Sequence, residues 1–122
     1  MWLTHAKTKN LGYNLWYQLY LHPECRYKDE LLNCDKEAAA AYKAVKHFPE
    51  ACPFCEYDSQ VRIFFSKVDH PIKECHFCPL MGDEDELECC GGHFRKWYMA
   101  NNIEERRNEA LIILKMIIAW KL

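Results

Sequence analysis

The sequence lacks the features that mark membrane-spanning, exported or disordered chains. Its first 22 residues hold no uninterrupted apolar run ahead of a small-residue cleavage site, and the longest apolar stretch, residues 110–120, is too short to cross a bilayer. Half of the 122 residues are hydrophobic, which argues against disorder. Because this length is typical of one folding unit, we predict a single soluble, cytoplasmic domain that does not bind a membrane.

A large charge excess, internal repeats and a catalytic motif are also absent. The formal net charge is −2, but residues 1–48 and 89–122 are each slightly basic, whereas residues 83–88 (DEDELE) contain five acids. An acidic centre repels the phosphates of nucleic acids. The composition therefore makes a nucleic-acid partner the weaker alternative, and the sequence predicts no enzymatic activity.

Two helices are predicted near the N-terminus. Residues 14–22 place Leu and aromatic side chains at helical spacing, and Pro23 ends this helix because proline disfavours helical geometry in the preceding residue. Residues 35–48 form the second helix, with Asp35 as its N-cap and Pro49 as its stop. Both are short and partly apolar, as expected for helices that pack on a core.

A third helix is predicted over residues 102–122. Asn102 is a suitable N-cap, and Glu105 follows three positions later, as in a capping box. We expect this helix to pack across the cysteine region and across the helix of residues 35–48. Its predicted apolar stripe comprises Ile103, Ala110, Leu111, Leu114, Ile117 and Ile118, widened by Ile113 and Trp120.

The middle of the chain is ambiguous in secondary structure. Val61, Ile63 and Phe65 alternate as in a short strand, although the surrounding residues also fit two helical turns. The predicted fold is therefore mainly α, or α+β if the strand forms. It consists of a helical domain with a small zinc-ribbon-like insertion of four cysteines.

Six of the eight cysteines lie in residues 51–92. Four of them follow the pattern C-x2-C-x19-C-x2-C: Cys52, Cys55, Cys75 and Cys78. A two-residue spacer lets one turn direct two thiolates at one point, and two such turns complete the tetrahedral shell that zinc requires. Because a reducing cytoplasm disfavours disulfides, the pattern predicts a structural Zn²⁺ without a reactive water.

Other uses of the cysteines stay open. Cys89, Cys90 or His93 could replace one zinc ligand, since two glycines between them allow a close approach. Cys25 and Cys34 are predicted to be ordinary buried or surface thiols, or one of them could join Cys89 and Cys90 at a second zinc. A redox dithiol would need a single pair at a helix N-terminus after a strand in a βαβ pattern, which this sequence lacks.

The Asp69-His70 pair between the two cysteine pairs resembles part of a zinc-stapled HNH nuclease. That family has a longer segment, containing an asparagine, before its second pair, and a further histidine just after it. Here only four residues separate His70 from Cys75, and no histidine follows Cys78 at that place. A degenerate nuclease is therefore a remote alternative.

Residues 48–122 resemble the small zinc-knuckle proteins of bacteriophage and prophage genomes. The resemblance rests on CPFC, on CHFCPL, on a later cysteine beside Gly91-Gly92, on HFRKWYMA and on the amphipathic C-terminal helix. It implies a virus-encoded accessory protein in the bacterial cytoplasm, from a group whose functions are mostly unassigned. The single domain, 1–122, would then comprise N-terminal helices (1–48), a zinc-binding region (49–92) and a C-terminal helix (93–122).

Two functions are compatible with these features. The first is a zinc-stabilised module that binds a host or viral protein and inhibits a defence or nucleic-acid enzyme, with the acidic run competing for a basic surface. The second is a nucleic-acid-binding regulator that uses the basic and aromatic stretch at residues 95–98, which could instead belong to a helix that is half core and half solvent. The residues predicted to meet a partner are Asp83, Glu84, Asp85, Glu86, Glu88, Arg95, Lys96 and Trp97.

Overall fold

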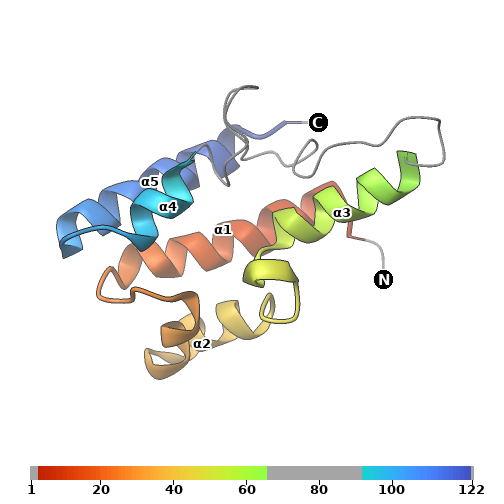
Figure 1. The fold of residues 1–122 in the computed structure, drawn as a ribbon. Helices are drawn as coiled ribbons and strands as arrows, with labels where there is room; N and C mark the ends of the chain where they lie inside the picture. Colours follow the sequence, from red (N-terminus) through yellow and green to blue (C-terminus); the bar gives the residue numbers. More distant parts are fainter. Residues whose placement is uncertain (1–2, 66–91, 122) are drawn as a thin grey trace.

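The computed structural model describes residues 3–65 and 92–121, without the side chains of Phe64 and Phe65. This part of the chain is helical and contains no strand, which confirms the mainly α class (Figure 1). Of the two conformations left open for residues 61–65, the strand is wrong and the helix is correct, because these residues continue the helix α3 (Pro53–Phe65). The elements are α1 (His5–Leu21), η1 (Lys28–Asn33), α2 (Lys36–Lys43), η2 (Pro49–Ala51), α3 (Pro53–Phe65), α4 (His93–Tyr98) and α5 (Ile103–Ala119).

Helix α1 lies at the centre of the fold. Helices α4 and α5 cover one side of it, η1 and α2 lie on the other, and α3 runs beside its N-terminal part (Figure 1). The main partner of α5 is thus α1, whereas packing against residues 35–48 was predicted. The ammonium of Lys9 on α1 donates to the carbonyls of Ile118 (3.0 Å) and Trp120 (2.8 Å), so the C-terminal end of α5 lies beside the start of α1.

The start of α1 is fixed by a side-chain cap that the sequence pattern did not reveal. The Thr4 hydroxyl accepts a hydrogen bond from the Lys7 amide (3.1 Å), which satisfies a donor that a helix start leaves open. The helix therefore begins at His5, earlier than predicted, and ends just before His22-Pro23, as expected.

The buried core is centred on the aromatic side chains of α1 and α4. The Trp16 ring meets the Trp97 ring edge-on, with 5.2 Å between centroids, and Trp97 is only 1% exposed. On α3, the Phe54 ring lies against Gly12 of α1 so closely that a Cβ at this position would overlap it. The core comprises Leu15, Trp16, Leu19, Cys25, Leu31, Ala38, Val45, Phe54, Trp97, Ala110, Ile113, Leu114 and Ile117.

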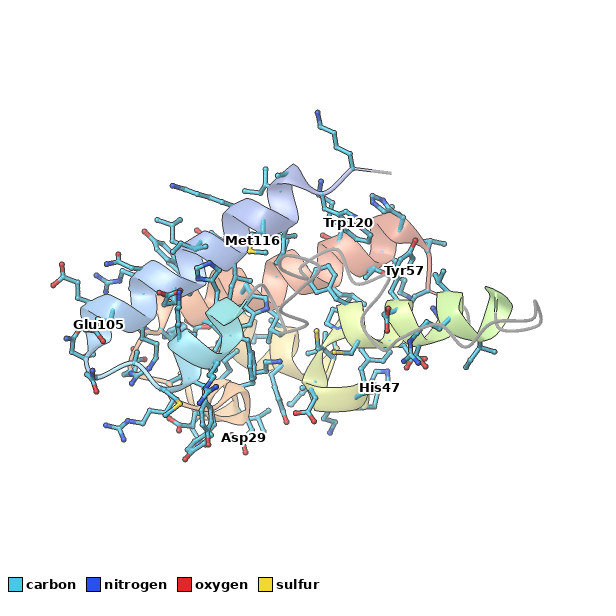
Figure 2. The ribbon with its side chains drawn as sticks, turned by 45° about the horizontal axis from the view of Figure 1, so that its top comes forward. Asp29, His47, Tyr57, Glu105, Met116 and Trp120 are labelled. Carbon is cyan, nitrogen blue, oxygen red and sulfur yellow. The ribbon has the colours of Figure 1, made fainter. Side chains whose placement is uncertain are left out.

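Trp120 joins the end of α5 to α3. Its ring meets the rings of Phe54 and Tyr57 edge-on, at centroid distances of 5.7 Å and 5.4 Å. Figure 2 shows Tyr57 of α3 and Trp120, just after α5, close together. The N-terminal segment is attached here as well, since the Leu3 amide donates to Oε1 of Gln60 on α3 (2.9 Å). These contacts hold the start of α3 against the core.

Both predicted N-caps are confirmed. The Asp35 carboxylate accepts from the Ala38 amide (2.8 Å), and the Asn102 side chain accepts from the Glu105 amide (2.8 Å). Helix α2 ends at Lys43, earlier than expected, and residues 44–47 continue in turns. The α5 stripe is narrower than predicted, because Ile103 and Ile118 are more than half exposed while Ala110, Ile113, Leu114 and Ile117 are buried.

Arg106 ties the start of α5 to the end of α1. This side chain is 3% exposed, and its guanidinium donates to the carbonyls of Pro23 (2.7 Å) and Ala100 (3.1 Å). Charged donors to otherwise unpaired carbonyls are among the stronger hydrogen bonds in proteins. Arg106 therefore fixes both the turn after α1 and the loop before α5.

We expect Arg106→Met to lower the free energy of unfolding by about 2–4 kcal/mol, because it leaves two carbonyls without their charged donor. The exposed neighbour Arg107 offers a matched control, and Arg107→Met should change stability by less than about 0.5 kcal/mol. Urea unfolding followed by far-UV circular dichroism measures both. Equal losses in the two variants would show that Arg106 has no special structural role.

Candidate metal centre

Cys52 and Cys55 lie in the first turn of α3. The Cys52 carbonyl accepts from the Glu56 amide (3.3 Å), which makes Cys52 the residue that begins the helix, and Pro53 follows as its first member. The two-residue spacer places Cys55 on the same side of this turn, and the two thiols hydrogen-bond each other. The first half of the predicted zinc site is therefore a helical turn.

The turn before Cys52 adopts an uncommon backbone conformation. Glu50 and Ala51 have positive φ angles of 55° and 49°, a region that costs a residue with a Cβ roughly 1–2 kcal/mol. The Lys28 ammonium donates to the Glu50 carbonyl (2.8 Å) and approaches the Ala51 carbonyl (3.4 Å). Because these bonds hold both carbonyls, Lys28 stabilises the turn that brings the chain to Cys52.

Lys28 itself is nearly buried. Its ammonium lies 4.7 Å from the centroid of the Phe94 ring and 5.7 Å from that of Trp16. The negative faces of aromatic rings attract a cation and offset part of the cost of removing it from water. One side chain thus links η1, α1, α4 and the approach to α3.

The environment of Cys52 favours its thiolate. The hydrogen bond from the Cys55 thiol, the charge of Lys28 and the amides of Cys55 and Phe54 together lower the pKa of Cys52 from 9.0 to about 6, against the opposing effect of burial. The thiolate is the form that binds zinc and that reacts as a nucleophile. A place at a helix N-terminus also meets one requirement of a redox dithiol, but the described residues contain no strand before it.

The other predicted functional residues in the range 66–91, whether zinc ligands, nuclease remnants or partner contacts, lie outside the described part of the chain. This applies to Cys75, Cys78, Cys89 and Cys90, to Asp69-His70 and to Asp83, Glu84, Asp85, Glu86 and Glu88. The zinc-ribbon insertion therefore stays a prediction. His93 is described: its Nδ1 lies 2.6 Å from a carboxylate oxygen of Glu109 on α5, so this ring already has a charged partner.

Helix α4 separates the predicted partner residues into two groups. Arg95 and Lys96 are exposed, whereas Trp97 is buried against Trp16 and cannot meet a partner without leaving the core. Trp97 is thus a core residue, as the alternative interpretation of this stretch held.

Tyr27 and Met99 complete an exposed surface that the sequence did not indicate. The Tyr27 and Tyr98 rings meet edge-on at 5.5 Å, and their hydroxyl hydrogen bond raises the pKa of Tyr98. Met99 is 61% exposed beside them. We call Tyr27, Arg95, Lys96, Tyr98 and Met99 the α4 surface. Tyr27 precedes η1 and is far from α4 in sequence, so no local pattern could have assigned it.

A second cluster of metal-binding residue types lies where the chain leaves α1 and enters α2. The Sγ atoms of Cys25 and Cys34 are 3.7 Å apart, and Cys34 Sγ is 4.0 Å from a carboxylate oxygen of Glu24. Burial and the neighbouring Cys34 raise the pKa of Cys25 to about 12. A prediction of two ordinary thiols did not anticipate this proximity.

The surface also has an open apolar groove between α1 and α2. Its volume is about 510 Å³, and it is lined mainly by tyrosines of α1 and alanines of α2. Tyr13 and Tyr17 stand next to each other here, with ring centroids 5.8 Å apart. The groove is separate from both cysteine clusters.

No family model, curated protein or solved structure matches this chain. The likeness to phage zinc-knuckle proteins accordingly stays a prediction. Among the helices that the structure describes, none is long and apolar enough to span a membrane.

With any bound metal removed by a chelator, we expect Cys52 to react with iodoacetamide with a pH midpoint near 6, because only the thiolate attacks. The stability that this thiolate provides is complete above pH 9 and is lost as the pH falls towards 6. Lys28→Met should move the midpoint upward, whereas Lys36→Met, at an exposed position, should not. Peptide mass spectrometry locates the label, and a midpoint near 9 in the unsubstituted protein would contradict the assignment.

Proposed function

We propose that this chain is a zinc-stabilised accessory protein without catalytic activity that acts by binding a protein partner through the α4 surface. The observation that supports it is the exposure of Tyr98 and Met99 on a short helix whose Trp97 is locked in the core. Tyrosine, methionine and arginine are enriched at protein interfaces, and aromatic side chains contribute much of the binding energy. Such residues on a fixed helix lose little conformational entropy when a partner binds.

The charge of the α4 surface indicates which partner would fit. Arg95 and Lys96 supply two positive charges beside the tyrosines, so the matching surface is acidic with an apolar centre. The acidic run at residues 83–88 would add a separate contact with a basic region of the same partner. In a phage setting, the partner would be a host or viral enzyme of defence or nucleic-acid metabolism, which this protein inhibits.

Zinc has a structural role in this proposal. Cys52 and Cys55 would provide two ligands, and Cys75 and Cys78 the other two, so the ion would close the segment that leads from α3 to α4. A closed shell of four thiolates stabilises the fold and supplies no reactive water. The lowered pKa of Cys52 supports this use, because a thiol that is already deprotonated binds the ion without first releasing a proton.

Removal of zinc should lower the temperature at which the middle third of the chain unfolds. We expect a chelator to lower the melting temperature measured from the far-UV helical signal, and Cys55→Ala to reproduce this decrease. Ser59→Ala, on the same helix but outside both cysteine clusters, is the control, and it should keep the melting temperature and the zinc of the unsubstituted protein. Unchanged melting after the chelator removes all metal would contradict the structural role.

Partner binding can be tested by affinity purification from a bacterial lysate, with and without nuclease treatment. We expect one protein to co-purify in both cases, and Arg95→Glu/Lys96→Glu to weaken its capture at least tenfold through charge repulsion. Arg107→Glu/Lys115→Glu carries the same charge change at exposed positions of α5 and should retain the partner. Equal capture by both double variants would exclude the α4 surface.

One observation favours a nucleic acid as the second candidate. Exposed tyrosines beside Arg95 and Lys96 form the kind of surface that stacks bases and contacts phosphates in single-stranded nucleic acids. In that case nuclease treatment would abolish the capture, and a mobility shift with an oligonucleotide would weaken steeply as salt increases. The same purification therefore separates the two candidates.

A further inference from the structure

We infer that His22, Glu24, Cys25 and Cys34 form a second zinc site, independent of the four-cysteine motif. The four residues come from two turns on opposite sides of η1. His22, Glu24 and Cys25 lie in the turn that follows α1, and Cys34 lies between η1 and α2. No residue of the predicted four-cysteine zinc shell takes part.

The first turn has the geometry of a zinc knuckle. His22 and Cys25 are separated by two residues, and the Cys25 amide donates to the His22 carbonyl (3.1 Å), which closes the turn. This is the spacing that lets two ligands face one ion in zinc proteins. Cys34 ends a turn closed by the same kind of hydrogen bond, since its amide donates to the Leu31 carbonyl (3.1 Å).

The donor atoms are close to the spacing that zinc requires. The 3.7 Å between the sulfurs of Cys25 and Cys34 matches the edge of about 3.8 Å expected for a tetrahedron with zinc–sulfur bonds of about 2.3 Å. A disulfide would need about 2.05 Å. One donor atom each from His22, Glu24 and Cys34 lie within 4.8 Å of one another. Cys25 is not one of these three and would join the shell through its contact with Cys34, so the donor atoms must move closer to bind an ion.

The surroundings also orient the histidine as a ligand. Its Nδ1 faces a carboxylate oxygen of Glu24 (3.3 Å), and its Nε2 lies 3.2 Å from Oδ2 of Asp35. With the ion on Nδ1, the Nε2–H donates to Asp35, whose other oxygen caps α2 at the Ala38 amide. A carboxylate behind a ligating imidazole fixes its tautomer and orientation in many zinc sites.

Rigid neighbours hold both turns in place. Arg106 donates to the carbonyl of Pro23, between His22 and Glu24, and the α2 cap holds Asp35 next to Cys34. Glu24 is more than half exposed, which gives an ion a path from solvent. Two thiolates, an imidazole and a carboxylate suit zinc better than magnesium or calcium, which prefer oxygen ligands alone.

The test measures metal content and ligand identity in the full chain. Protein purified from zinc-supplemented cells should contain two zinc ions per chain by elemental mass spectrometry. Cys34→Ser should contain one, and His22→Gln should bind the second ion more than about 100-fold more weakly, since loss of a ligand costs more than the 10–100-fold of losing an outer-shell partner. His47→Gln, which replaces a histidine outside the cluster, should retain both ions. Circular dichroism verifies that the variants are folded.

A second measurement does not depend on any variant folding. Zinc added to the metal-free wild type should protect Cys25 and Cys34 from alkylation, as mapped by peptide mass spectrometry. Two zinc ions in Cys34→Ser, or alkylation of Cys25 and Cys34 at the wild-type metal-free rate when zinc is present, would overturn the site. Loss of the four-cysteine zinc alone would instead expose Cys52 and Cys55, so the two proposals fail separately.

Discussion

The buried ammonium of Lys28 is the interaction on which the candidate metal centre depends. It holds the carbonyls of the turn at Glu50-Ala51, contacts the faces of the Trp16 and Phe94 rings, and lowers the pKa of Cys52. A cation in this position compensates for an unfavourable backbone conformation and for its own loss of water. The first cysteine pair is therefore coupled to the aromatic core, although the two are distant in sequence.

Helix α1 serves as the common support for the functional surfaces. Its two ends are tied to α5, through Lys9 at the N-terminal end and through Arg106 at the turn after its C-terminal end. The proposed second zinc site uses that same turn, and the α4 surface rests on the side of α1 that holds Trp16. Two proposed metal sites and one binding surface would thus share a single rigid element, which suits a small protein that presents residues to a partner.

Several features could be predicted because they depend on neighbours in the sequence. Asp35 and Asn102 cap helices through side chains that reach amides three residues away, so the residue type and the following pattern were sufficient. Residues 61–65 stayed ambiguous, since a short apolar run fits the spacing of a strand and of a helix. The structure resolves this, because the helix that begins at Pro53 continues through Phe65. The burial of Trp97 was also undecided in the sequence, because Trp16 is needed to cover it.

By itself, then, the sequence determined the mainly helical class, the two caps and the spacing of the first cysteine pair, all of which are short-range properties. Tertiary structure alone decided that Cys25 and Cys34 lie side by side, that Tyr27 joins Tyr98, and that Lys28 reaches the turn before Cys52. Each of these contacts closes a loop whose ends are brought together by packing on α1. Sequence patterns do not show which distant residues come into contact. These contacts form because apolar side chains from both sides of α1 are buried against it.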